Sequence, residues 1–103
     1  MRRGDVWWVE LPPPVNRRPV LLLSRDRAYA VRSGVLVAFL TTTVRNIPVE
    51  VKLTPVDGVP KDCVVNLDLI TTLPKSALGY RICSLSAERM SEVASALHFA
   101  LDL

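Results

Sequence analysis

The chain has 103 residues, of which 50% are hydrophobic and 22% are charged, and its net charge is +3 at pH 7. This size and composition suit one domain, which we expect to span residues 1–103, and they exclude an intrinsically disordered chain. The apolar runs Val20–Leu23 and Val35–Leu40 are far shorter than the ~20 residues that cross a bilayer, and Met1–Arg3 precedes no apolar leader, so we predict a cytoplasmic protein without a membrane span.

The first half of the chain reads as strands. Asp5–Leu11 is rich in β-branched and aromatic residues and is ended by three prolines, which cannot donate to a sheet. Arg18–Arg25 is apolar in its middle, which predicts a strand covered on both faces. Asp26–Ser33 is polar and irregular, with room for one helical turn. Gly34–Thr42 is the third predicted strand.

The next strand, Pro48–Leu53, alternates apolar and polar residues, as a half-exposed strand does. We expect it to pair with the third strand through a turn at Arg45–Asn46. The prolines and the Asp-Gly pair within Pro55–Pro60 predict a loop. The remaining predicted elements before the C-terminal segment are strands at Asp62–Leu67 and Leu69–Leu73, a short helical or turn segment at Pro74–Leu78, and a strand at Gly79–Ser84.

The C-terminal segment has helical periodicity. Ser86 suits an N-cap, and a helix over Ser86–Leu101 places one apolar stripe on one face. That predicted core stripe is Met90, Val93, Ala94, Leu97 and Leu101. Several short strands and one terminal helix predict an α+β, mainly β fold: a small SH3-like antiparallel barrel with a C-terminal helix packed on it.

Charge is distributed unevenly along the chain. Residues 1–45 hold eight arginines against three acidic residues, whereas residues 46–103 hold five basic and seven acidic residues. Arginine suits phosphate because its planar fork donates bidentate hydrogen bonds and keeps its charge. The pattern indicates a basic face for nucleic acid; on charge alone, an ordinary solubilising surface is the alternative.

Most catalytic templates are missing. The four glycines form no phosphate-binding loop, the lone His98 has no partner for acid–base catalysis by paired histidines, and the carboxylates are scattered singly. Cys63 and Cys83 match no zinc spacing and are expected to be core residues. We therefore predict no metal and no cofactor, and an enzyme here would depend on arginine and hydroxyl groups.

Six segments, taken in order, resemble the MazF/PemK/Kid toxins of bacterial toxin–antitoxin systems. They cover nearly the whole chain with spacing similar to that of the family. The segments are Arg3–Leu11, Arg17–Asp26, Val35–Thr41, Val49–Val51, Asp62–Asp68 and Met90–Leu97. The resemblance implies a PemK/CcdB-like barrel, a homodimer, and a metal-independent endoribonuclease that inhibits growth by cutting single-stranded RNA at short sequence motifs. It also implies a cognate MazE-like antitoxin as partner.

The resemblance implies catalytic roles for Arg18, which stands immediately before the proline of the second strand, and Thr41, which closes the third. The implied reaction is attack of a ribose 2′-hydroxyl on the adjacent phosphate. The charge donors and hydroxyls beside these two positions are the expected RNA-binding residues: Asn16, Arg17, Thr42, Thr43 and Arg45.

The chain departs from the family pattern in two places. Pro12–Asn16 is shorter than the usual first loop and lacks its Gly-Ser-Glu-Gln stretch, and Thr71–Pro74 replaces a frequent Arg-Thr-Ile-Asp. No general base is apparent in the sequence, so two other functions stay open. One is a toxin of the same fold that inhibits DNA gyrase, as CcdB does, and the other is a barrel that binds RNA or protein without catalysis.

Overall fold

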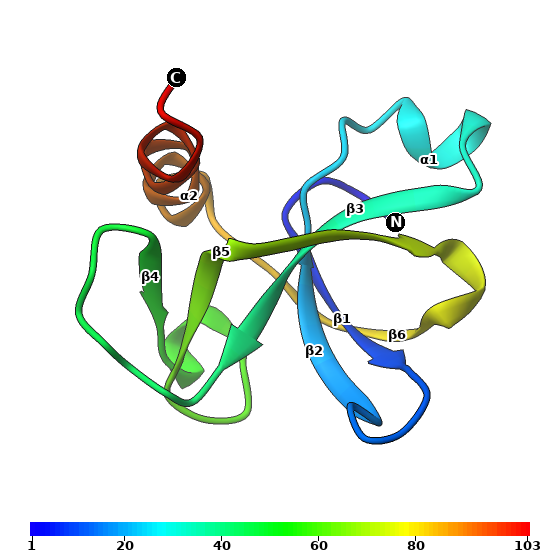
Figure 1. Ribbon diagram of the computed structural model, residues 1–103, viewed down its shortest axis with the longest axis horizontal. Coiled ribbons are helices and arrows are strands. Elements are labelled where there is room, and N and C mark those ends of the chain that lie inside the picture. The colour runs from blue at the N-terminus through cyan, green and yellow to red at the C-terminus, as the bar shows by residue number, and fades with distance from the viewer.

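The computed structural model describes all residues from Met1 to Leu103. Its six strands form one antiparallel sheet with the order β4-β5-β3-β2-β1-β6. The elements are β1 (Asp5–Glu10), β2 (Arg17–Leu22), α1 (Ala28–Val31), β3 (Gly34–Thr41), β4 (Glu50–Leu53), η1 (Pro55–Asp57), β5 (Cys63–Pro74), η2 (Lys75–Ala77), β6 (Leu78–Ser84) and α2 (Ala87–Leu101). The sheet curls strongly, but its outer strands β4 and β6 do not pair, so it forms a half-barrel (Figure 1). The predicted fold class is confirmed.

The curled sheet has a hydrophobic core on each face. Leu21 and Leu23 point into the core that α2 covers, while Val20 and Leu22 point into a second core with Tyr29 of α1. The prediction that this strand is covered on both faces is therefore confirmed. No helix of the chain has the length and apolar character needed to span a membrane.

The predicted pairing of the fourth strand was wrong. β4 pairs with β5, in the register Val51↔Val65, and not with β3. Both edges of β3 are already occupied, by β2 and β5, so no edge remains for β4. The Glu50 carboxylate stabilises the connection that leads to β4. The backbone N–H groups of Arg45 and Asn46 both donate to Glu50 Oε1, at 2.9 and 3.0 Å.

The two strands predicted on either side of Asp68 form one continuous strand, β5, of 12 residues. Its first half lies between β3 and β4, and its second half pairs with β3 alone. A register shift occurs between the pairs Ala38↔Ile70 and Leu40↔Val65. This irregularity leaves residues 66–69 of β5 opposite Phe39 alone without ending the strand, which the sequence pattern could not indicate.

The C-terminal helix was predicted correctly in extent. Ser86 is its N-cap and accepts a hydrogen bond from the Arg89 N–H at 3.1 Å. Val93 and Ala96 are buried against the sheet, but Leu101, predicted as core, is 56% exposed. α2 packs on β4 and β5. In its last turn Ala100 packs against the core, so Leu101 lies outside the covered face.

Candidate functional site: a cationic pocket between splayed strands

The site forms where β2 separates from β3. Their ladder ends at the pair Val20↔Phe39, and extending this register by two residues places Arg18 opposite Thr41. The Leu23 N–H donates to the Leu36 carbonyl at 2.8 Å. In an antiparallel pair every second residue points its N–H at the neighbouring strand, so the backbone nitrogen of residue 19 faces the Leu40 carbonyl. Pro19 has no N–H to donate. The ladder stops there, and the strands diverge.

The side chain of Arg18 occupies this opening. Its Nη2 donates to the Leu40 carbonyl oxygen at 3.1 Å, and its guanidinium carbon lies 5.4 Å from the centroid of the Phe39 ring. The guanidinium is thus held by a backbone oxygen and an aromatic ring, neither of which neutralises its charge. Its other N–H groups have no partner within the protein, so they can donate to a ligand.

Arg18 is also one of the residues that line a pocket of about 590 Å³. Its lining comes from β1, β2, β3, β6 and the segment before β5: Trp8, Arg18, Pro19, Leu40, Thr41, Thr42, Val59, Pro60, Lys61, Cys63 and Ile82. The lining holds two cationic side chains and two threonine hydroxyls but no carboxylate. Such a pocket suits an anion with several oxygen acceptors, such as a phosphodiester.

Thr41 keeps its donor free. Its Oγ1 accepts a hydrogen bond from the Thr43 N–H at 3.2 Å, which fixes the hydroxyl oxygen at the end of β3. The hydroxyl hydrogen has no acceptor among the protein atoms, so it can be donated to a phosphate oxygen or to a ribose hydroxyl.

The structure brings together three of the seven sequence-predicted site residues: Arg18, Thr41 and Thr42 line the pocket. The other four lie outside its lining. Asn16, at φ 58°, donates its side-chain amide to the Pro14 carbonyl. Arg17 packs against the rings of Trp8 and Tyr80, beside the pocket. Thr43 and Arg45 are exposed in the segment between β3 and β4.

The sequence reasoning missed two pocket residues, Trp8 and Lys61. In the sequence, Trp8 looks like any other residue of a predicted strand, and Lys61 lies between a predicted loop and the next strand, with nothing that marks it as functional. Their position depends on which strands become neighbours. β1 lies next to β2 in the sheet, and the segment that carries Lys61 leads into β5 beside the end of β3.

Cys63, which lines the pocket, is not a candidate nucleophile or base. Burial, reinforced by the nearby Asp62 carboxylate, raises the pKa of this thiol to about 11. It is therefore protonated at neutral pH and acts as a small apolar wall residue. No group of three or more histidine, cysteine, aspartate or glutamate side chains is placed to hold a metal ion.

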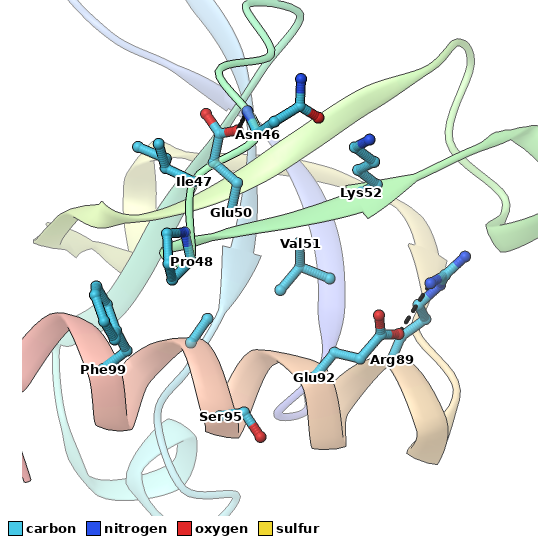
Figure 2. Close-up of a pocket in the computed structure, with 11 residues that line it drawn as sticks. Asn46, Ile47, Pro48, Glu50, Val51, Lys52, Arg89, Glu92, Ser95 and Phe99 are labelled. Carbon is cyan, nitrogen blue, oxygen red and sulfur yellow. Dashed lines mark hydrogen bonds and ion pairs between the residues drawn. The ribbon is translucent and has the colours of Figure 1, made fainter.

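A second, larger cavity, of about 890 Å³, lies between β4 and α2 (Figure 2). It differs in charge from the first, because Lys52 and Arg89 are balanced by Glu50 and Glu92, and Arg89 is itself paired with Glu92 at 2.9 Å. Figure 2 shows Glu50 and Lys52 on the side of β4 that faces away from the helix. An RNA phosphate would meet carboxylates here, so the smaller pocket is the candidate site.

The fold and the pocket define a small half-barrel protein with a pocket suited to an anion where β2 and β3 separate, and comparison with known proteins gives its family. The model of the "PemK-like, MazF-like toxin of type II toxin-antitoxin system" matches residues 2–101. The chain is 44% identical over 98 residues to the probable endoribonuclease MazF2 of Mycobacterium tuberculosis, with 94% of each chain covered. It is 41% identical over 101 residues to the probable endoribonuclease MazF5 of the same species, covering 97% of this chain and 92% of the relative.

Solved structures agree with this match. The Mycobacterium tuberculosis toxin MazF-mt6 is 34% identical, with a TM-score of 0.88 over 96% of this chain and 97% of that one. An endoribonuclease in complex with its cognate antitoxin, from a mycobacterial species, is 32% identical, with a TM-score of 0.90 over 100% and 96%. The chain belongs to the PemK-like, MazF-like toxins of type II toxin–antitoxin systems, and the predicted family is confirmed.

Proposed function

We propose that this chain, an endoribonuclease toxin, cuts single-stranded RNA in the cationic pocket, with Arg18 and Thr41 as its catalytic residues. The observation that carries the assignment is the guanidinium of Arg18, held at the Leu40 carbonyl, on a residue that lines a pocket without carboxylates. The gyrase-inhibitor and non-catalytic alternatives are not favoured, because relatives that are 34–44% identical over most of the chain are named endoribonucleases.

The chemistry follows from what the pocket can supply. The ribose 2′-oxygen forms a bond to phosphorus and loses its proton, while the bond from phosphorus to the 5′-oxygen breaks and that oxygen gains a proton. The products are a 2′,3′-cyclic phosphate and a 5′-hydroxyl. Arg18 stabilises the negative charge that develops on the phosphoryl oxygens, and the Thr41 hydroxyl positions the phosphate or the 2′-oxygen. No general base lines the pocket, so rate acceleration rests on charge stabilisation and alignment.

The rest of the RNA contact extends from this pocket. Lys61 and Thr42 face the same phosphate or its neighbour. The sequence-predicted RNA-binding residues outside the pocket would contact flanking nucleotides: Asn16, Arg17, Thr43 and Arg45. Such a contact needs unpaired RNA, because a duplex would present its backbone on a wide cylinder that cannot enter a pocket of this size.

We further propose three properties of the working toxin. Residues 1–103 act as one toxin domain, the toxin is a homodimer, and it acts in the cytoplasm, where its RNA substrate is. A cognate MazE-like antitoxin binds it and covers the cationic pocket; one structural relative is described as an endoribonuclease in complex with its cognate antitoxin. An acidic antitoxin segment would suit Arg18 and Lys61 as an RNA phosphate does.

The test is cleavage of purified total RNA in EDTA, with mapping of the new 5′ ends. Wild type should cut at defined positions without added metal, and Arg18→Ala should lower single-turnover cleavage by ~10²–10³-fold, as loss of a preorganised charge donor does. Arg32→Ala is the matched control, since Arg32 is an exposed arginine at the opposite end of β3 from Thr41. Activity lost in EDTA and restored by magnesium, or full activity in Arg18→Ala, would reject the assignment. Inhibition of gyrase supercoiling without RNA cleavage would favour the gyrase alternative.

A further inference from the structure

An arginine stacked on two aromatic rings lies beside the pocket. The guanidinium carbon of Arg17 is 4.4 Å from the centroid of the Trp8 ring and 5.1 Å from that of Tyr80. Arg17 Nη2 donates to the Tyr80 hydroxyl, and Arg17 Nε faces Glu10 Oε1 at 3.9 Å. We call Trp8, Arg17 and Tyr80 the aromatic–arginine stack. It is open to solvent: Tyr80 is 55% exposed, and the Arg17 side chain is 45% exposed.

The stack is continuous with the pocket. Side chains two residues apart on a regular strand share a face, so Arg17 lies on the face of Pro19. The pairing of β6 with β1 is irregular around Tyr80, and the 5.1 Å contact with Arg17 places the Tyr80 ring on this side. Pro19 and Ile82 line the pocket, and Trp8, which belongs to the stack, lines it too. The strands β6, β1 and β2 therefore present one surface that runs from the pocket to the stack.

We propose that the aromatic–arginine stack is the subsite for one unpaired base of the RNA, beside the phosphate that Arg18 contacts. The proposal rests on the proposed function. Unpaired bases are bound by stacking on aromatic rings and on arginine planes. This surface offers both, and its Trp8 also lines the pocket. Arg17 and Tyr80 belong to neither hydrophobic cluster, so packing of the core does not account for the stack.

A nucleobase fits the stack better than an antitoxin peptide does. The stack carries a positive charge, and its only acidic neighbour, Glu10, is held 3.9 Å from Arg17 at the outer end of β1. A phosphate in the pocket sets the direction of the next nucleotide, whose base then reaches a flat π surface.

The experiment uses a short RNA with a mapped cleavage site and replaces the nucleotides flanking that site, one at a time, by abasic ribonucleotides. In wild type, one abasic position should raise KM about 10-fold or more and leave kcat unchanged, which is the range that base stacking gives. Tyr80→Ala should raise KM for the intact RNA by a similar factor. In this variant, the abasic nucleotide at the sensitive position should cause no further rise in KM. Tyr80→Phe keeps the ring and should reproduce the wild-type profile.

Each outcome decides the proposal. Coupling between Tyr80→Ala and a single abasic position supports a stacking subsite. Identical abasic profiles in wild type and Tyr80→Ala overturn it, as does a Tyr80→Ala variant that weakens only antitoxin binding. In those two cases Arg18-dependent cleavage persists, so the proposed function stands. RNA that wild type does not cut at all rejects the proposed function and the subsite with it.

Discussion

Nη2 of Arg18 donates a 3.1 Å hydrogen bond to the carbonyl oxygen of Leu40, the acceptor that the N–H of residue 19 would use if that residue were not proline. The same dipeptide thus ends the ladder between β2 and β3 and fills the gap with a cation. Pro19 removes a backbone donor, which opens the strands, and Arg18 satisfies the acceptor that this leaves without a partner. The guanidinium is positioned by the backbone and not by a carboxylate, so its charge stays available.

Pro19→Ala should therefore lower activity without removing any cationic or hydroxyl group from the pocket. The new N–H can pair with the Leu40 carbonyl and extend the ladder, which displaces the Arg18 guanidinium from its anchor. We expect about a 10-fold loss in single-turnover rate, as misplacement of a catalytic group produces. The added backbone hydrogen bond and the greater freedom of the unfolded chain offset each other, each at about 1 kcal/mol, so Tm should change little. Full activity together with a hydrogen-exchange-protected amide at position 19 would contradict this.

Thr41→Val should reduce cleavage about 10-fold or more, because it removes the hydroxyl proposed to align the reacting groups while keeping shape and β-branching. Thr41→Ser, which keeps the hydroxyl, should retain most of the activity. Single-turnover cleavage of a short RNA measures both, with Tm recorded in parallel. Equal rates for Thr41→Val and wild type would remove Thr41 from the catalytic site.

RNA affinity should fall with salt, since arginine contacts to phosphates release counterions. Affinity is measured on an RNA with a 2′-deoxy nucleotide at the cleavage site, which binds without reacting. Arg17→Ala and Arg45→Ala should each lower the slope of log K against log salt by about 0.7 for each lost phosphate contact on a single strand. Arg32→Ala should leave the slope unchanged. Slopes equal to wild type in the first two variants would place those arginines outside the RNA contact.

The toxin should be a homodimer. The end of α2 leaves Phe99 61% and Leu101 56% exposed, and a second chain would cover such apolar groups. Light scattering at ~10 µM, a concentration well above the Kd of a stable dimer, should give twice the 11.4 kDa chain mass. The double variant Phe99→Asp, Leu101→Asp should shift the mass toward the monomer if these side chains contribute. A monomeric wild type would refute the dimer, and a dimeric variant would place the interface elsewhere.

The free energy of unfolding should fall at alkaline pH. Burial raises the pKa of the Cys63 thiol from its ordinary value of 9.0 to about 11, so between these values the folded protein keeps a proton that the unfolded chain has released. Below pH 9 both states are protonated and the effect is absent. From pH 8 to 11, wild type should lose roughly 1–3 kcal/mol more than Cys63→Ala does, as a shift of this size implies. Burial also raises the pKa of Cys83, which both proteins share. Parallel pH profiles would show that Cys63 ionises as freely as an exposed thiol.

The sequence by itself determined the features that depend on local periodicity. The apolar stripe that includes Val93, the Ser86 cap and the alternation around Val51 each record which side of an element is buried, and the structure agrees with all three. The resemblance to the toxin family also singled out Arg18, as the arginine immediately before the proline of the second strand.

Only the tertiary structure decided which elements become neighbours. Burial patterns say that a strand is covered but not by which strand, so the pairing of β4 with β5 depended on which edges of β3 were already occupied. The same limit hid Trp8 and Lys61, whose side chains reach the pocket only because β1 lies next to β2 and the approach to β5 passes the end of β3. Leu101 shows the converse: the helix forms as its period predicts, but in the last turn Ala100 and not Leu101 packs against the core, and this depends on how the helix lies on the sheet.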